Sequence, residues 1–238
     1  MSARALDLQS RVDSLAPARV GSPQDTYPRI RLRWLPPAPS PLFYWPTPTG
    51  WRHPLTAARP HDRSPSLELR LATPADADAV AAIHTASWRT AYRGILDDEF
   101  LDGPLDSYSR DRWRAWFTLI GGPPAHLLLA ELRGAPVGFL CVVHSGGEFG
   151  DLVANLHVLV EARRGGVGRQ LLREGARLVH EQGHSAMHLW VYSTNSEAIR
   201  FYEREGGCAE SEQPHLAADG QMRPSRRYVW RDLSPFLD

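Results

Sequence analysis

A glycine-rich turn most constrains how this chain can fold, and it reads Arg163-Arg164-Gly165-Gly166-Val167-Gly168-Arg169. The turn follows an apolar run at residues 156–160 and precedes a leucine-bearing stretch at residues 171–179. Glycine lets backbone N–H groups approach an anion without a Cβ in the way, and a helix start presents unpaired amides and the positive end of its dipole. The segment therefore predicts a strand, a phosphate-binding turn and a helix in succession.

Two other phosphate motifs are excluded by the residues themselves. A Walker loop needs a lysine, and all 27 basic residues of this chain are arginine. The dinucleotide-binding pattern G-x-G-x-x-G needs a third glycine, and Leu171 occupies that position. For the glycines taken alone, an ordinary turn between a strand and a helix remains the alternative.

A second motif, Asn195-x-x-Ala198-x-x-Phe201-Tyr202-Glu203, follows about thirty residues later. In this order, the two motifs resemble the GNAT superfamily of acetyl-CoA-dependent N-acyltransferases. The resemblance extends over residues 67–233, with an opening strand and turn at residues 69–76 and a first-helix region at residues 86–94. It implies an α/β fold, with a mixed, mostly antiparallel sheet, helices on both faces and a parallel strand-helix-strand unit that holds the cofactor.

The resemblance also implies which residues hold acetyl-CoA. Backbone groups of the strand before the turn would bind the pantetheine arm, and amides of the turn would bind the diphosphate. Asn195 would bond the arm, and a helix cap is the alternative for this side chain. The predicted cofactor-binding residues are Val158, Leu159, Val160, Arg163, Arg164, Gly165, Gly166, Val167, Gly168, Arg169, Asn195 and Tyr202.

Transfer of an acetyl group to an amine needs a base and an acid. A free amine with a pKa near ~10 is almost wholly charged at pH 7, so a base must take its proton. The resemblance makes Tyr202 the acid that protonates the leaving thiolate, with an aromatic packing residue as the alternative. Relatives often carry a glutamate base at a position that falls here near Leu152. The candidates are therefore Asp151, one residue away, and Glu148, further upstream. His157, where many relatives have a tyrosine, is expected to be a packed strand residue.

No motif specifies the acceptor. The predicted substrate-binding residues are Trp88, Tyr92 and Trp190. Residues 66–238 contain twenty-three acids against eighteen arginines, which favours a cationic amine. The bulky aromatic residues favour a small molecule, and peptide amines stay open. The alternative function is a CoA-binding regulatory or interaction module that has lost catalysis.

Composition divides the chain into two parts. Residues 1–65 contain twelve of the twenty prolines and nine arginines against four acids, which predicts a Pro/Arg-rich, mostly disordered extension. A partner-binding arm built on the aromatic cluster at residues 43–45, or upstream sequence translated from an early start, are the alternatives. Residues 66–238 form the predicted N-acetyltransferase domain.

The remaining signals bear on partners and location. The chain has no apolar stretch near the ~20 residues that a membrane span needs and no secretory signal, so no membrane partner is expected. Cys141 and Cys208 form no C-x-x-C pair and are expected to be small buried hydrophobes in a protein of the reducing cytoplasm. The exclusive use of arginine gives no indication of nucleic-acid binding. A homodimer stays open.

One motif competes with this interpretation. His180-Glu181-Gln182-Gly183-His184 formally matches the zinc-protease pattern H-E-x-x-H. That chemistry needs both histidines on one face of a continuous helix, whereas Gly183 falls where the helix after the turn should end. No metal is therefore expected.

Patterning predicts the order of the elements. A buried helical face should carry Trp113, Trp116, Phe117 and Ile120. Thr194 and Glu197 have the spacing of a capping box. The expected strands are residues 67–71, 127–132, 137–143, 155–160, 188–192 and 228–232, and the expected helices are residues 74–92, one from about 107, one ending near 181 and one opening at 194.

Overall fold

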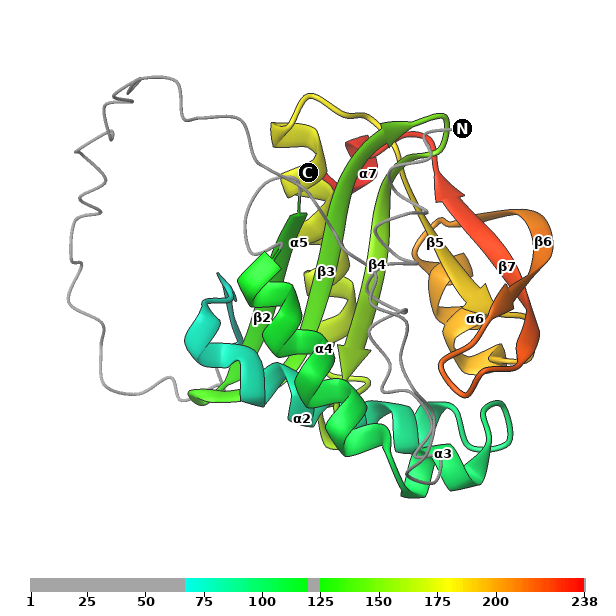
Figure 1. Cartoon of the computed structure of the whole chain (residues 1–238). Coiled ribbons are helices and arrows are strands. Elements are labelled where there is room, and N and C mark those ends of the chain that lie inside the picture. Colours follow the sequence, from blue (N-terminus) through cyan, green and yellow to red (C-terminus); the bar gives the residue numbers. More distant parts are fainter. Residues whose placement is uncertain (1–66, 120–124, 238) are drawn as a thin grey trace, which may run out of the picture. The chain divides into compact units, whose positions relative to one another are not determined.

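A computed structural model of the chain describes residues 67–119 and 125–237, which form a seven-stranded sheet (Figure 1). The strand order is β1-β2-β3-β4-β5-β7-β6, and only β4 and β5 pair in parallel. The predicted mixed, mostly antiparallel sheet is therefore confirmed. The predicted extension at residues 1–65, and Ile120 of the predicted helical face, lie outside the described residues. The strands are β1 (Leu67–Leu71), β2 (Ala125–Leu132), β3 (Ala135–Gly147), β4 (Gly150–Val158), β5 (Met187–Tyr192), β6 (Cys208–Leu216) and β7 (Met222–Trp230).

Helices cover both faces of the sheet, and each face has its own apolar core (Figure 1). Consecutive β2 residues Leu128 and Leu129 belong to different cores, because successive strand side chains point to opposite faces. Trp113 and Trp116 are 1% and 6% exposed in the core under α2 and α4, which confirms the predicted helical face. The helices are α2 (Ala77–Ala91), α3 (Asp98–Asp102), α4 (Leu105–Leu119), α5 (Val167–Glu181), α6 (Ser196–Arg204) and α7 (Ser234–Leu237), with 3-10 turns η1 (Pro74–Asp76) and η2 (Val160–Ala162).

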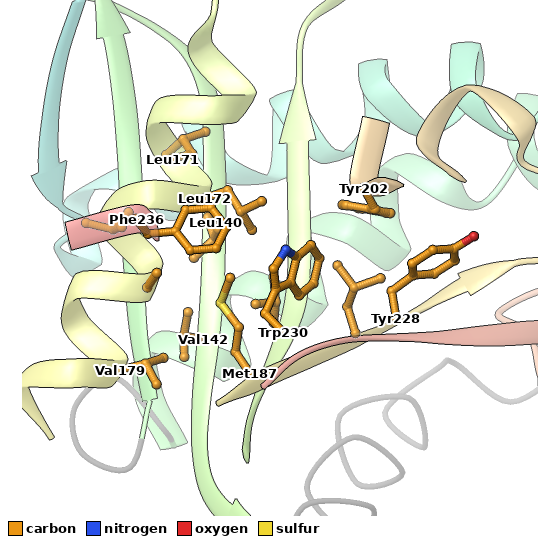
Figure 2. Packing of buried hydrophobic residues seen from close by; sticks show 14 of the residues in the cluster. Leu140, Val142, Leu171, Leu172, Val179, Met187, Tyr202, Tyr228, Trp230 and Phe236 are labelled. Atoms are coloured by element: carbon orange, nitrogen blue, oxygen red, sulfur yellow. The ribbon is translucent and has the colours of Figure 1, made fainter. Parts of the chain in front are cut away.

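The second core lies between the sheet and the helices α5, α6 and α7 (Figure 2). Leu171 and Leu172 of α5 are fully buried there against Leu140 and Val142 of β3. Gly175 belongs to this contact, since a Cβ at that position would lie 2.9 Å from Leu140 Cδ2. The absence of a side chain at Gly175 therefore lets α5 approach the sheet closely.

The start of α6 corrects a prediction. The predicted capping box begins at Thr194, whereas the N-cap is Asn195, whose Oδ1 accepts the N–H of Ala198 at 3.2 Å. Asn195 is buried, so its carbonyl oxygen is committed to the helix start. Asn195 is thus a helix cap, and the contact of its side-chain NH2 group with the pantetheine arm stays a prediction.

Four elements were not predicted, namely α3, η2, β6 and α7. The edge strand β6 has almost wholly exposed side chains and therefore lacks the apolar alternation that marks a strand. The short helix α3 follows Asp97, whose carboxylate accepts the N–H of Glu99 at 3.2 Å. Cys208, at the start of β6, is exposed, which corrects its predicted burial, whereas Cys141 is buried and burial raises the pKa of its thiol to about 12.

The parallel pair β4 and β5 separates along its length (Figure 1). Asp151 pairs with Met187 and Leu152 pairs with His188, and no further pairing joins these two strands. Beyond this point β4 carries a bulge at Ala154, because Val142 and Cys141 of β3 oppose Val153 and Asn155. We call residues 153–158 of β4 and 189–192 of β5 the open end, and residues 150–152 and 187–188 the closed end.

Candidate active site

The backbone of β4 at the open end offers unpaired hydrogen-bonding groups. β4 pairs with β3 on one side up to Val158, whereas its side toward β5 has no strand partner after Leu152. An extended chain of amides can add to such an edge as a further strand would. The predicted strand, however, ends early, since Val160 begins the 3-10 turn η2 and is 58% exposed. The N–H of Leu159 donates to Val137 O at 2.9 Å and is therefore occupied.

The turn after β4 has the geometry of an anion-binding concavity. Arg164 and Gly166 have left-handed φ angles of 65° and 81°, and Gly166 is the N-cap of α5. The first bond into the helix is from Gln170 N–H to Gly166 O at 3.0 Å. The amides of Val167, Gly168 and Arg169 are therefore the orphan donors of the first turn, and they fit a diphosphate.

Glycine 168 serves packing beside this concavity. A Cβ on Gly168 would lie 3.4 Å from Cζ of Phe201, which is on α6, and 3.9 Å from a methyl group of Val158. The start of α5 is therefore held against α6 and the end of β4. This contact places the amides of the turn next to the helix that carries Tyr202.

The three arginines of the turn have different surroundings. Arg163 donates from Nε to Val158 O at 3.2 Å, and its guanidinium also contacts Thr90 of α2 and Glu197 of α6. Arg169 pairs with Glu205 at 2.9 Å. Arg164 is exposed and has no ion pair among the described residues. Arg163 thus links three elements around the open end, and the guanidinium of Arg164 is the one free to meet an anion.

Tyr202 projects from α6 into the core beside β7. Its ring lies 6.0 Å from that of Trp230 and 6.2 Å from that of Tyr228 (Figure 2). Burial raises the pKa of Tyr202 above its ordinary value, and the nearby phenol of Tyr92 raises it further. The hydroxyl therefore keeps its proton at neutral pH and is a weaker acid than an ordinary phenol.

The predicted substrate residues divide into two groups. Tyr92 lies edge-on to Tyr192 of β5 with ring centroids 5.3 Å apart, and burial raises the pKa of Tyr92 to about 12. Trp88 is 8% exposed and belongs to a core that joins α2, α3 and α4. Its ring packs edge-on against that of Tyr92, with centroids 5.1 Å apart. Trp190 lies elsewhere on β5, with the guanidinium of Arg227 4.5 Å from the centroid of its ring.

His157 is a packed residue, as expected. Its Nε2 accepts the indole N–H of Trp88 at 3.2 Å, and its Nδ1 lies 3.3 Å from the hydroxyl of Ser87. Burial, with the charges of Arg112 and Arg163, lowers the pKa of His157 to about 3. The ring is therefore neutral, and the indole donor fixes its proton on Nδ1.

The surroundings of Asp151 do not favour its predicted role as the general base. The carboxylate is fully buried, accepts two backbone N–H groups and contacts two imidazoles. Leu152 is buried in the core under α2 and α4, and the bulge at Ala154 comes after both residues. Asp151 and Leu152 therefore point to opposite faces, and Asp151 faces α5.

His188 was not singled out by sequence analysis, yet it occupies the neighbourhood expected for a base. It pairs with Leu152, so its side chain lies on the same face as that position. Its Nδ1 is buried with no hydrogen-bond partner among residues 67–119 and 125–237. Burial with the charge of Arg227 lowers the pKa of His188 below 6.5, and backbone groups of Phe149 and Gly150 partly offset this. Glu148 is exposed in the turn between β3 and β4. No sequence signal marks His188, because its relation to Leu152 depends on sheet register.

The H-E-x-x-H motif lacks the zinc-protease geometry. α5 ends at Glu181, and Gly183 follows with a left-handed φ of 79°. His180 is therefore in the last turn of the helix, whereas His184 lies beyond it and turns toward Asp151. As the sequence predicted, the two histidines do not lie on one face of a helix.

Comparisons with known proteins agree with this geometry. The family described as Acetyltransferase (GNAT) family matches residues 80–207. A Mycobacterium tuberculosis protein named "Probable N-acetyltransferase Rv2775" is 30% identical over 188 residues, which cover 71% of this chain and 87% of that protein. A Bacillus subtilis protein named "Uncharacterized N-acetyltransferase YuaI" is 30% identical over 132 residues, 54% of this chain and 72% of that one.

Solved structures share the fold. The PaiA N-acetyltransferase of Thermoplasma acidophilum, in complex with coenzyme A, superposes with a TM-score of 0.54 at 19% identity over 68% of this chain and 98% of that one. An N-acetyltransferase of Staphylococcus aureus Mu50 gives 0.55 at 16% identity over 71% and 99%. Among residues 67–119 and 125–237, no helix has the length and apolar character needed to cross a membrane. The chain belongs to the GNAT acetyltransferase family and is an acetyl-CoA-dependent acyltransferase.

Proposed function

We propose that this protein transfers the acetyl group of acetyl-CoA to a primary amine by direct attack in a ternary complex, with a small molecule as the acceptor. The observation that carries the proposal is the open end of β4, where an unpaired strand edge leads into the amides of residues 167–169. This arrangement suits a ligand that is an extended chain of amides at one end and a diphosphate at the other.

The residues have separate tasks in this proposal. Acetyl-CoA supplies the acyl thioester. The β4 edge binds the pantetheine arm, and the first-turn amides of α5 with Arg164 bind the diphosphate. As the amine nitrogen bonds to the carbonyl carbon and the carbon–sulfur bond breaks, Tyr202 Oη gives its proton to the sulfur. The phenol of Tyr202 is protonated throughout the neutral range, so the proton is present when the thiolate forms.

His188 is our candidate for the base that takes the proton of the amine. It lies on the face of Leu152, its Nδ1 has no partner, and its lowered pKa leaves the ring neutral at pH 7. Glu148, acting through water, is the second candidate, because it lies in the turn that precedes β4. Both are near Arg227, since Glu148 and His188 each interact electrostatically with that guanidinium.

The acceptor class follows from the side chains around Tyr92 and Trp190. The aromatic rings of Tyr92, Tyr192 and Trp190 come from α2 and β5 and provide apolar contacts for the body of a small amine. Peptide amines stay a second class. A cytoplasmic location and a homodimer stay predictions from the sequence.

The central test combines calorimetry with an acceptor panel. We expect the full chain to bind coenzyme A with one-to-one stoichiometry and to acetylate at least one amine among polyamines, aminoglycosides, amino acids and peptides, with thiol release as the readout. Coenzyme A binding without transfer to any amine would favour the alternative, a binding module that has lost catalysis. No uptake of coenzyme A would overturn the proposal itself.

The base is identified by two matched variants. His188→Gln should lower turnover by about 10²-fold or more while the affinity for acetyl-CoA is unchanged, because only proton transfer is lost. Since the pKa of His188 is lowered, the acidic limb of the wild-type rate profile should lie below pH 6.5. If Glu148→Gln produces this loss and His188→Gln does not, Glu148 is the base.

A further inference from the structure

Four polar side chains meet at the closed end, on the face of the sheet that carries α5. His144 Nδ1 lies 2.6 Å from Asp151 Oδ2, and His184 Nδ1 lies 2.9 Å from the same oxygen. His126 Nδ1 is 2.6 Å from the other ring nitrogen of His144. These residues come from β2, β3, β4 and the connection between α5 and β5, so the cluster joins four segments of the chain.

The carboxylate of Asp151 is held in one orientation. Its Oδ1 accepts the backbone N–H groups of Ser145 and Gly146 at 3.0 and 3.1 Å. Its Oδ2 faces the Nδ1 atoms of both imidazoles. Oδ1 is therefore fixed by the end of β3, and Oδ2 lies near two nitrogen atoms, of which His184 Nδ1 is also 2.9 Å from Oδ1.

The charge of this carboxylate needs compensation. Asp151 is fully buried, and a buried anion without a cationic partner is costly. Among residues 67–119 and 125–237, its ion-pair partners are His144 and His184, and no arginine takes part. A cation between the three side chains would balance the buried charge.

The donor set indicates which cation fits. Two imidazole nitrogens with one carboxylate oxygen suit zinc, cobalt and nickel, whereas calcium and magnesium prefer oxygen alone. The three ligand atoms lie within 4.8 Å of one another. An ion about 2.0 Å from each would set them about 3.3 Å apart, so each nitrogen would move roughly half an ångström away from Asp151 Oδ2. The side chain of His184 is 35% exposed, against 7% for His144, and is the one with room to move.

His126 has the role of a supporting partner. When His144 binds an ion through Nδ1, its proton is on Nε2, which then donates to His126 Nδ1. Such outer hydrogen bonds fix the tautomer and orientation of a metal-binding imidazole.

We propose that His144 Nδ1, Asp151 Oδ2 and His184 Nδ1 bind one divalent transition-metal ion, with zinc as the best fit and a solvent molecule completing the coordination beside His184. The ion ties the end of β3 to the segment that enters β5, and it stabilises the closed end of the β4–β5 pair. The site is separate from the turn at residues 163–169 and has no part in acetyl transfer.

The test uses the full chain without a histidine tag, stripped of metal by a chelating resin. Zinc should bind with one-to-one stoichiometry and raise the Tm by about 5 °C at a concentration a hundredfold above its Kd, whereas calcium and magnesium should not. Cobalt should give the visible absorption of a low-coordinate site. The affinity for coenzyme A should be the same with and without zinc, which separates this site from the proposed function.

Variants decide which residues bind the ion. His184→Ala should weaken zinc binding by more than about 100-fold, and His126→Ala by about 10- to 100-fold. His180→Ala is the matched control, because His180 is four residues away, exposed and outside the cluster. Absence of one-to-one binding, or equal affinity in wild type and His184→Ala, overturns the proposal. Should His184→Ala fail to fold, the chelator and zinc cycle on the wild type still decides, since an unchanged Tm also overturns it.

Discussion

The two ends of the β4–β5 pair use the same strand in opposite ways. At the closed end, Asp151 and Leu152 pair with β5, and side chains from four segments surround the carboxylate of Asp151. At the open end, β4 has no partner on that side, and the chain turns at Gly166 into a helix whose first amides are unbonded. At the closed end the carboxylate of Asp151 has backbone and side-chain partners within the chain, whereas the open end leaves backbone groups of β4 and α5 for a ligand.

This difference shows how one strand can hold a fold and bind a cofactor. The pairing at the closed end fixes the position of β4 relative to β5, and the two strands diverge from that point. The bulge at Ala154 then turns β4 away from β5. The unpaired backbone groups of β4 at the open end can still form hydrogen bonds, because a ligand or water can reach them.

The largest expected effect concerns Tyr202. Tyr202→Phe should lower turnover by about 10²- to 10⁴-fold because the thiolate loses its proton donor, while the affinity for acetyl-CoA stays within twofold. Rates and calorimetry check this directly. Tyr228→Phe is the control, since that hydroxyl donates to Glu203 at 2.9 Å and takes no part in transfer. Unchanged turnover in Tyr202→Phe would remove Tyr202 from the chemistry.

The closed end should respond in stability. A Cβ on Gly150, which has a φ of 77°, would lie 1.9 Å from Ala186 O. Gly150→Ala should therefore lower the free energy of unfolding by about 3 kcal/mol or more, because backbone must move to relieve the clash. Gly147→Ala, where a Cβ meets no atom within 4 Å, should be far milder. Equal unfolding midpoints in urea would contradict the packing described for the closed end.

The open end should respond in ligand affinity. Gly166→Ala introduces a Cβ at a left-handed φ beside the first-turn amides, so coenzyme A should bind at least about tenfold more weakly. Gly134→Ala is matched, with a φ of 74° and open space, but it lies in the turn between β2 and β3. Both variants should lose about 1 kcal/mol of stability, and only the first should lose affinity in calorimetry. Equal affinities of the two variants for coenzyme A would contradict the assignment of the turn as the diphosphate-binding site.

The last effect is a dependence of stability on pH. The pKa of His157 is lowered to about 3 in the folded chain, against an ordinary value of 6.5. Between these pH values the unfolded chain binds a proton at His157 and the folded chain does not. Stability should therefore be full above pH 6.5 and fall as the pH decreases from 6.5 toward 3, by at most about 1.4 kcal/mol per pH unit for this group. His84, whose pKa burial also lowers, adds to the loss.

Urea unfolding at pH 7, 6 and 5 measures this slope. His157→Gln should be less stable at pH 7, but its free energy of unfolding should decrease less steeply as the pH falls. The reason is that glutamine does not bind a proton in either state. A slope identical to that of the wild type would show that His157 is protonated in the folded state. Comparing the two slopes then distinguishes a His157 that only packs at the open end from one whose protonation also changes the stability.

Local signals predicted the elements around the turn. The helix at residues 167–181 and its end before Gly183 follow from glycines whose φ requirement is set within a few residues. The edge strand β6 escaped prediction because its residues face solvent and carry no apolar period. The role of Thr194 was predicted wrongly since its neighbour Asn195 also can cap, and only the fold decides which one does.

The candidate site was predicted in part. The turn and the position of Tyr202 on the helix after β5 could be predicted, and the base could not. Asp151 and Leu152 are adjacent in sequence, yet one faces the α5 core and the other faces α2, and the bulge that affects this pattern comes after both. His188 enters the site only because β5 pairs with β4 at Leu152.

The sequence by itself determined the anion-binding turn, the order of most strands and helices, and the family resemblance, since each depends on residues close together in the chain. The tertiary structure alone decided where β4 and β5 part, which face each carboxylate takes, and that His126, His144, Asp151 and His184 meet. The physical reason is that strand register and helix packing bring together side chains up to tens of residues apart, and no local propensity records which of them will become neighbours.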